Sequence, residues 1–433
     1  MFFLRLFLLC WCGFAGAAAH AQRLSPLAAA PDWSQLEAFQ ETITREEFAR
    51  LLNQVYAPGG AAKGMVDLEA EHAVIKTALT PVAEFRLRFA KDAASAKAAP
   101  RFWKAAAEFP PTTPDKPLAS LKIAIDPGHI GGAWAKMEER WFRIGESRPV
   151  AEGEMTLRVA QMLAPRLQAL GAEVSLVRTT MEPITSERPE TLRPVARREL
   201  ARLGVLAPRE NYDGARDPLR ANTVQAHSEF LFYRIGEIRK RAEVVNTQFR
   251  PDLVICLHFN AEGWGDPLRP EFVPRNHLHV LVNGCYSTGE LRFDDQRFEM
   301  LHKLLSRTYP EELAASEKVA GALAIATKLP PYRYTAGNAV RAGSGAYVWA
   351  RNLLANRLYH APVLFLEPYV MNSENVWARV QAGDYEGKFT IGGEPRRSIF
   401  REYADAVAEG LREYYTKARA AAAGAPAQPV VPK

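Results

Sequence analysis

The sequence predicts an α/β protein: a three-layer domain with a mostly parallel twisted sheet and helices on both faces, preceded by a small α+β domain. Three short apolar runs predict the sheet, at residues 122–129, 252–260 and 362–367. Apolar runs of this length are typical of strands buried on both faces. Each run leads to a polar residue, His129, His258 or Glu367. Because open α/β sheets bind ligands beyond the carboxyl ends of their strands, we expect these three side chains at the functional site.

The first 21 residues predict a secretory signal peptide. Arg5 supplies the positive charge, residues 7–14 are apolar, and residues 19–21 form a small-residue cleavage site before Gln22. The apolar stretch is short for a membrane span, and no later run reaches transmembrane length. We therefore expect a secreted protein, in the periplasm or outside the cell, without stable membrane insertion.

Residues 22–32 predict a short linker, and residues 33–105 a small α+β accessory domain. Thr44 and Glu47 form a capping box, and an apolar stripe follows as far as Val55. Alternating apolar residues at 66–70 and 85–89 predict strands. Residues 106–119 are proline-rich and predict the linker to the main domain.

Residues 120–417 predict the main domain. After the first strand we expect a helix at about 154–170, a strand at 173–178 and a long helix at about 224–249. A strand at 277–282 and helices at 316–327 and 401–415 complete the pattern. Residues 181–220, rich in arginine, glutamate and proline, predict an insertion that walls the site, covers it, or is simply a solvated surface. Residues 418–433 predict a disordered tail.

Charge and cysteine content restrict the possible partners. The formal net charge of +6 suits an anionic polymer, but no arginine–aromatic patch or nucleic-acid motif accompanies it, so we expect no nucleic-acid partner. Cys256 and Cys285 are the only cysteines after the predicted signal peptide. Both fall in apolar strands, which favours free core thiols over a disulfide. A packed thiol is also the favoured interpretation of Cys256, although a soft metal ligand is the alternative.

The residues at the predicted strand ends are those of a hydrolytic metal site. Two neutral imidazoles and one carboxylate, with a fourth position left to water, form the ligand set of catalytic zinc. Either histidine alone would more simply be a hydrogen-bonded core residue. Glu367 ends a strongly apolar strand, and burial of its carboxylate is costly unless the group is paired or functional. From the residues alone, the prediction reaches a secreted zinc hydrolase.

Four motifs in order resemble the zinc-dependent N-acetylmuramoyl-L-alanine amidases of the amidase type 3 family, which are cell-wall hydrolases. They are Asp126 to His129, Glu152 ahead of a helix, His258 to Ala261, and Glu367 followed by Tyr369 and Asn372. The resemblance covers residues 120–417. It implies that His129, Glu152 and His258 bind Zn²⁺ and that Glu367 is the catalytic base.

The sequence departs from the family pattern at three places, one of which is Cys256, where the family usually has serine. Ile130 separates His129 from Gly131 and Gly132, and the stretch before Glu152 is long and polar. Glu154 is the alternative to Glu152 as the second ligand. Asp126 and Asn260 are candidates to orient the imidazoles, and Asp126 is equally suited to cap the following turn. Arg341 is a candidate contact for a carboxylate of the stem peptide, or a solvated loop charge.

The resemblance implies hydrolysis of the amide between N-acetylmuramic acid and L-alanine, with peptidoglycan as the partner and an activator protein as a second candidate partner. A zinc exopeptidase or carboxypeptidase with the same ligands is the first alternative. A catalytically silent protein that binds the cell wall is the second.

Overall fold

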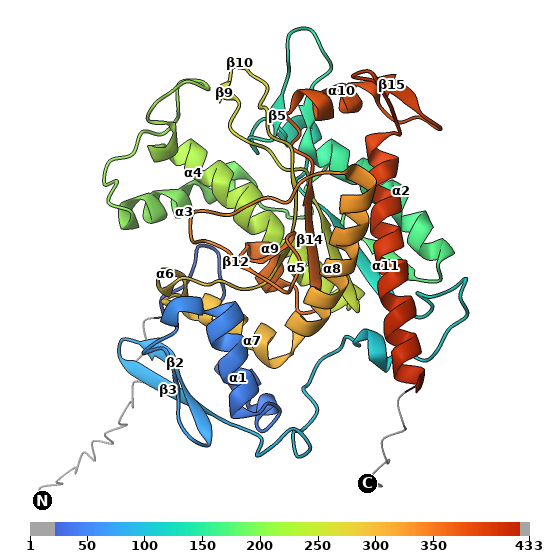
Figure 1. The fold of residues 1–433 in the computed structure, drawn as a ribbon. Coiled ribbons are helices and arrows are strands. Elements are labelled where there is room, and N and C mark those ends of the chain that lie inside the picture. Colours follow the sequence, from blue (N-terminus) through green and yellow to red (C-terminus); the bar gives the residue numbers. More distant parts are fainter. Residues whose placement is uncertain (1–21, 425–433) are drawn as a thin grey trace, which may run out of the picture.

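A mixed sheet of seven strands organises the protein, whose computed structural model describes residues 22–424 (Figure 1). The strand order is β12-β13-β11-β14-β8-β4-β7. Strands β14, β8, β4 and β7 are mutually parallel. Strands β11 and β13 are parallel to each other, and β11 is antiparallel to β14. Strand β12, at the edge of the sheet, is antiparallel to β13. The strands are β4 (Lys122–Pro127), β7 (Glu173–Leu176), β8 (Leu253–Leu257), β11 (Leu278–Val282), β12 (Val340–Arg341), β13 (Val348–Ala350) and β14 (Val363–Pro368). The predicted α/β fold class with a mostly parallel sheet is confirmed.

The three apolar runs form the centre of this sheet. β8 lies between β4 and β14 and is parallel to both. Every residue of β8 is buried, as expected for a strand covered on both faces. The carboxyl ends of the three strands therefore meet at one edge of the sheet.

Helices cover both faces of the sheet (Figure 1). Ile123, Ile125 and Ile255 pack in one buried cluster with α2 (Glu152–Ala169), α8 (Thr308–Thr327) and α11 (Ile399–Gly424). Ala124 and Cys256, which alternate with them, pack on the other face against the long helix of residues 224–249 and α9 (Leu354–Leu358). Alternation along each strand thus produces the three predicted layers.

The predicted helix at 224–249 is continuous, and it contains two π-helical segments. It comprises α4 (Val224–Phe230), η7 (Leu231–Gly236), α5 (Glu237–Val244) and η8 (Val245–Phe249). Other helices are longer than predicted. α2 begins at Glu152, α8 begins at Thr308, and α11 continues to Gly424.

The segments predicted as linkers and tail are more ordered than expected. The prediction of a disordered tail from 418 is wrong for residues 418–424, which are helical. Arg419 is buried there, and its guanidinium donates to the carbonyl oxygens of Pro110 and Ala119. At the other end, the backbone N–H groups of Arg23 and Ser25 donate to carboxylates of the main domain. The predicted signal peptide at 1–21 lies outside the described residues.

The N-terminal region forms its own antiparallel sheet, in the order β1-β2-β3. Its elements are η1 (Trp33–Phe39), α1 (Arg45–Leu51), η2 (Leu52–Tyr56), η3 (Pro58–Gly60), β1 (Val66–Leu68), β2 (His72–Leu79) and β3 (Val82–Arg88). The capping oxygen of Thr44 accepts from the N–H of Glu47, as predicted. Strand β2 was not predicted. Phe48 and Leu51 share a buried cluster with Leu304 of the main domain, and the division into two domains stays a prediction.

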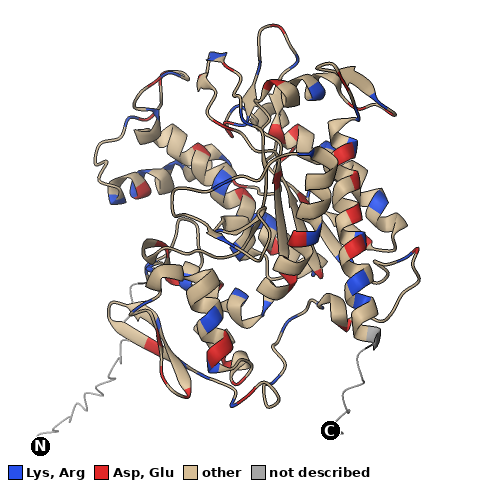
Figure 2. Cartoon of the chain, in the orientation of Figure 1, with Lys and Arg blue, Asp and Glu red and all other residues tan. Residues whose placement is uncertain are grey.

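Shorter elements surround the edge of the sheet where β4, β8 and β14 end. They include η5 (Gly132–Trp134), β5 (Trp141–Phe142), β6 (Val150–Ala151), α3 (Pro189–Arg202), η6 (Arg220–Asn222), β9 (Gly265–Asp266) and β10 (Arg269–Pro270). Figure 1 shows α10 (Glu374–Ala382) and β15 (Phe389–Ile391) at the same end of the molecule as β5. The remaining elements are η4 (Ala106–Glu108), α6 (Thr288–Leu291), α7 (Asp294–Leu305) and β16 (Glu394–Arg396). Both signs of charge are interspersed over the helices (Figure 2). Among the described residues, no helix is both long enough and apolar enough to cross a membrane.

Candidate metal centre

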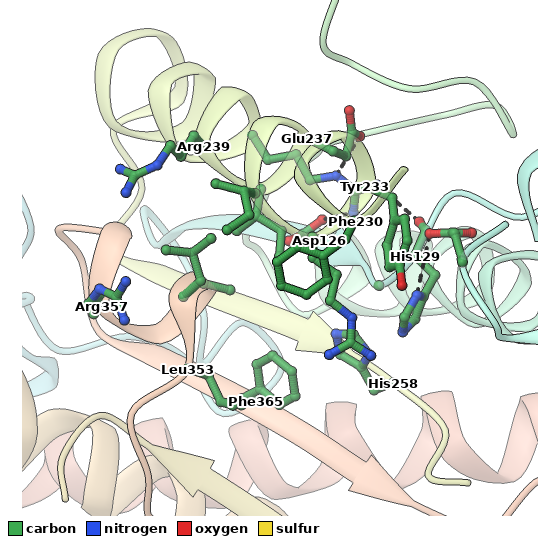
Figure 3. A pocket seen from close by; sticks show the side chains of 18 of the residues that line it. Asp126, His129, Phe230, Tyr233, Glu237, Arg239, His258, Leu353, Arg357 and Phe365 are labelled. Carbon is green, nitrogen blue, oxygen red and sulfur yellow. Dashed lines mark hydrogen bonds and ion pairs between the residues drawn. The ribbon is translucent and has the colours of Figure 1, made fainter. Parts of the chain in front are cut away.

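Three predicted residues meet at the carboxyl edge of the sheet. His129 follows β4, His258 follows β8, and Glu152 is the first residue of α2. One nitrogen or oxygen atom from each lies within 4.8 Å of the others. The side chain of Glu152 is 1% exposed and each histidine side chain is 15% exposed. The two imidazoles lie at one end of a cavity (Figure 3).

Glu152 bridges the two imidazoles. Its Oε1 lies 3.0 Å from Nδ1 of His258 and accepts from the N–H of Phe259 at 3.1 Å. Its Oε2 lies 3.3 Å from Nε2 of His129 and 3.1 Å from Nε of Arg140. Glu154, the alternative ligand, is exposed and does not join the cluster.

A residue that the sequence did not predict, Glu138, holds the other nitrogen of His129. Its Oε1 lies 3.4 Å from Nδ1 of His129. The same carboxylate, which is 1% exposed, accepts from the N–H groups of Ile130 and Gly131. A carboxylate on the far nitrogen of a metal-binding imidazole fixes its orientation. No signal in the sequence distinguishes Glu138 from the exposed Glu139 beside it, because the contact depends on the fold of the loop.

The turn after β4 brings its backbone against the cluster. His129 has a φ of 58°, a left-handed conformation that is uncommon for a residue with a side chain. A Cβ atom on Gly128 would lie 2.2 Å from the ring of His258, so only glycine fits there. The buried Ile130 packs among Leu192, Leu231 and other apolar residues of the 181–249 region. Ile130 therefore anchors these helices to the turn.

Glu367 lies next to the cluster, in β14. The ring of Phe365, two residues earlier, stacks on His258 with 4.3 Å between centroids. Both Phe365 and Glu367 line the cavity that holds the histidines. Burial raises the pKa of Glu367 to about 7, because the opposing charge of His258 does not compensate for desolvation and Glu152 adds repulsion. A carboxyl with a pKa near neutrality is suited to exchange protons.

Neighbouring groups also shift the pKa values of Glu152, His129 and His258. Burial alone would raise the pKa of Glu152, but His129 and the hydrogen bond with His258 outweigh it and lower the pKa to about 2. Burial lowers the pKa of His129. Burial acts in the same direction on His258, but Glu152 and Glu367 reverse it and the pKa is raised. Glu152 is therefore an anion at neutral pH.

These residues fit a divalent metal ion. The donor set of two imidazoles and one carboxylate is that of catalytic zinc. The buried Oε2 of Glu152 has no hydrogen-bond partner among the described residues, although the ion-pair contact with Arg140 is near. A buried carboxylate oxygen without a hydrogen bond is costly unless a cation completes its environment. The cluster of His129, Glu152 and His258 is therefore a candidate metal centre.

The remaining predicted site residues lie elsewhere. Asp126 contacts neither imidazole and does not cap the turn, because its carboxylate accepts from Nη1 of Arg241 and from the hydroxyl of Tyr359. Asn260 connects to the segment after β14 through its backbone N–H and carbonyl groups. Arg341 is exposed in the edge strand β12, where its guanidinium donates to the carbonyl of Gly345, and it does not line the cavity.

Two further histidines and the cysteines have structural environments. His277 lies 3.4 Å from Glu262, and Tyr332 packs against both His277 and His279. Burial lowers the pKa of His279 to about 3, which keeps it neutral. Cys256 is fully buried among apolar side chains, and burial raises its pKa. Cys256 and Cys285 are both free, as predicted, although Cys285 is partly exposed.

The cavity beside the cluster has a volume of about 510 Å³ and is rich in arginine. It extends from the histidines to Arg239 and Arg357 (Figure 3). Those two arginines are paired with carboxylates of α7. Arg234 and Arg351 also line the cavity, and neither has a carboxylate within ion-pair distance in the described part of the chain. The cavity therefore offers free positive charge beside the candidate metal centre.

Fold and site together define an α/β protein with a candidate divalent-metal centre at the carboxyl edge of its sheet. No family model and no curated protein matches the sequence. Solved structures do align with the chain. The N-acetylmuramyl-L-alanine amidase Ami1 from Mycobacterium smegmatis is 14% identical with a TM-score of 0.36, and the alignment covers 69% of this chain and 99% of Ami1.

Two further structures align over a similar share of the chain. The CwlD amidase from Clostridioides difficile, in complex with the GerS lipoprotein, is 11% identical with a TM-score of 0.39, over 69% of this chain and all of CwlD (100%). The amidase AmiC2 of Nostoc punctiforme is 14% identical with a TM-score of 0.35, over 68% of this chain and 96% of AmiC2. Since these identities and TM-scores are low, the function proposed below rests on the residues of the site.

Proposed function

We propose that this protein is a zinc-dependent hydrolase that cleaves the amide between N-acetylmuramic acid and L-alanine in peptidoglycan. One observation carries the proposal: donor atoms of His129, Glu152 and His258 converge, and both histidines line one cavity together with Glu367. Two imidazoles, one anionic ligand and a separate carboxyl with a pKa near 7 are the parts that hydrolysis of an amide requires.

Each part has a defined role in this proposal. Zinc, when bound, would lower the pKa of water and polarise the amide carbonyl. His129, Glu152 and His258 would hold it, and Glu138 would fix the ring of His129 through Nδ1. Glu367 would accept a proton from the attacking water on a carboxylate oxygen and deliver it to the nitrogen of the leaving amine.

The choice of substrate is supported by three features. The motifs of the sequence resemble those of amidases that act on the cell wall. The predicted signal peptide at residues 1–21 would export the protein to the compartment of the polymer. The free arginines Arg234 and Arg351 suit the carboxylates of a stem peptide. An activator protein is a further proposed partner, since CwlD forms a complex with a lipoprotein.

Digestion of purified peptidoglycan tests this function. We expect the protein to release intact stem peptides from glycan strands, which mass spectrometry detects as free L-alanine amino termini. Chelation and the substitution Glu367→Gln should each abolish release, whereas Glu386→Gln, at a side chain that is 87% exposed, should have no effect. Cleavage of free peptides with intact peptidoglycan left untouched would instead indicate the exopeptidase alternative.

A further inference from the structure

A second cavity adjoins the candidate metal centre. It has a volume of about 590 Å³, and we call it the tryptophan cavity. Its wall includes Lys136, Glu139, Trp141, Arg220, Glu262 and Trp264. Arg140 lines both this cavity and the arginine-rich cavity, and its Nε lies 3.1 Å from Oε2 of Glu152. The two cavities therefore meet at the metal cluster.

The two tryptophans are attached to the elements that carry the metal cluster. Trp141 pairs in register with Ala151, and Glu152 follows directly. Trp264 lies in the loop that leaves β8 after His258, and Phe142 packs against its ring with 5.5 Å between centroids. Both tryptophans are only half-buried. The ammonium of Lys136 lies 4.5 Å from the centre of the Trp141 ring, so each tryptophan has one neighbour against its ring and remains partly exposed in the cavity.

Charged side chains surround the aromatic surfaces. Arg220 pairs with Glu139 at 2.6 Å, and both residues line the tryptophan cavity. Ala215 of the predicted insertion also lines it, and Nε of Arg216 donates to Asp266 at 3.0 Å. The insertion therefore forms part of the wall and is tied to the loop that carries Trp264. An aromatic floor with polar groups at its rim suits a ligand that has apolar faces and a hydroxylated edge.

Both cavities contain basic side chains, but only the tryptophan cavity has indole rings, and the two arms of the proposed substrate also differ in chemistry. One arm of the scissile amide is a glycan, whose sugar rings present C–H faces and hydroxyl groups. The other arm is a peptide that carries carboxylates, which the free arginines Arg234 and Arg351 of the first cavity complement. Neither Trp141 nor Trp264 lines the arginine-rich cavity.

We propose that the tryptophan cavity binds the sugar rings of the glycan strand and that the arginine-rich cavity receives the stem peptide. The substrate would then lie across the metal cluster in one direction only, with Arg140 at the boundary between its two arms. This inference rests on the proposed function for the class of substrate. It assigns a sugar-binding role to Trp141 and Trp264.

Binding of an uncharged sugar without a peptide tests the assignment, and we would use tetra-N-acetylchitotetraose in isothermal titration calorimetry. A sugar ring that packs on an indole loses this apolar contact when alanine replaces the tryptophan and keeps part of it when phenylalanine does. We therefore expect Trp264→Ala to weaken binding about tenfold and Trp264→Phe to weaken it much less. The control is Trp377→Ala, a half-buried tryptophan of α10 outside both cavities. Trp141→Ala gives a second measurement should Trp264→Ala fail to fold.

Unchanged sugar binding in both alanine variants, or no sugar binding by the unsubstituted protein, would overturn the assignment. The reversed pattern would also overturn it, namely loss of stem-peptide binding in Trp264→Ala and loss of sugar binding in Arg351→Ala. The probe carries no stem peptide and so lacks the amide that the proposed reaction cleaves. Its binding is therefore independent of that reaction. Cleavage of peptidoglycan without sugar binding at Trp264 would refute this inference alone, and sugar binding without cleavage would refute the proposed function alone.

Discussion

The carboxyl of Glu367 should destabilise the metal-free protein at alkaline pH. Its pKa in the folded chain is about 7, against 4.5 for an unperturbed glutamate. Because the folded state holds this proton more tightly than the unfolded state, folding is favoured below pH 4.5. The loss of folding free energy caused by ionisation of Glu367 grows as pH rises from 4.5 to 7 and is complete above 7. Substitution by glutamine removes the charge and should remove this loss.

The size of this effect follows from the difference between the pKa of Glu367 in the folded chain and in the unfolded chain. A difference of one unit between the folded and unfolded pKa corresponds to about 1.4 kcal/mol, so the difference for Glu367 corresponds to about 3 kcal/mol. Glu367 is partly exposed to the cavity, and solvent screening reduces the expected value to about 2 kcal/mol. For a chain of this length that corresponds to an increase in melting temperature of roughly 2 °C.

Thermal unfolding of the chelated protein measures the effect. Glu367→Gln should melt above the unsubstituted protein at pH 8, and the difference should nearly vanish at pH 4. The exposed control Glu386→Gln should show no such pH dependence. Equal melting temperatures at pH 8, or a Gln variant that is less stable there, would refute the argument that burial of this charge opposes folding.

Three further predictions concern the metal and the substrate. Glu138→Gln should weaken zinc binding about 10–100-fold in a competition with a chelator, because His129 loses its orienting carboxylate, and the exposed neighbour Glu139→Gln should leave affinity unchanged. Arg351→Ala should raise KM for stem-peptide substrates about tenfold with kcat nearly unchanged, whereas the control Arg341→Ala should leave KM unchanged. Equal KM values in the unsubstituted protein and both variants would contradict the role assigned to the cavity. Zinc at 100 times its Kd should stabilise the chelated protein by about 2.7 kcal/mol, and His258→Ala should abolish the gain in melting temperature.

The central sheet was predictable because its signals are local. Apolar runs without polar alternation identified β4, β8 and β14, and the rule for parallel sheets placed their ends at one edge. The helix at 224–249 was also identified correctly by its apolar periodicity. By contrast, β2 was missed although Ala73, Val74 and Ile75 are buried in it, because its pattern mixes one apolar run with polar residues.

The site was less predictable wherever it depends on loops. Glu152 was favoured over Glu154 by resemblance alone, and the structure distinguishes them because only the first residue of α2 faces the histidines. Asp126 was predicted either to orient an imidazole or to cap the following turn, but Arg241, 115 residues away in the sequence, donates to its carboxylate instead. Arg341 was a candidate substrate contact with a solvated loop charge as the alternative; it lies outside the cavity, whereas Arg140 and Arg351 line it.

The most direct test of the account is anomalous diffraction at the zinc edge from crystals of the protein loaded with zinc. We expect one strong peak bounded by His129, Glu152 and His258, and loss of that peak in the variant Glu152→Gln. A peak at another position, or no peak at the cluster in a protein that binds one zinc per chain, would contradict the assignment of the metal centre on which the proposed hydrolysis depends.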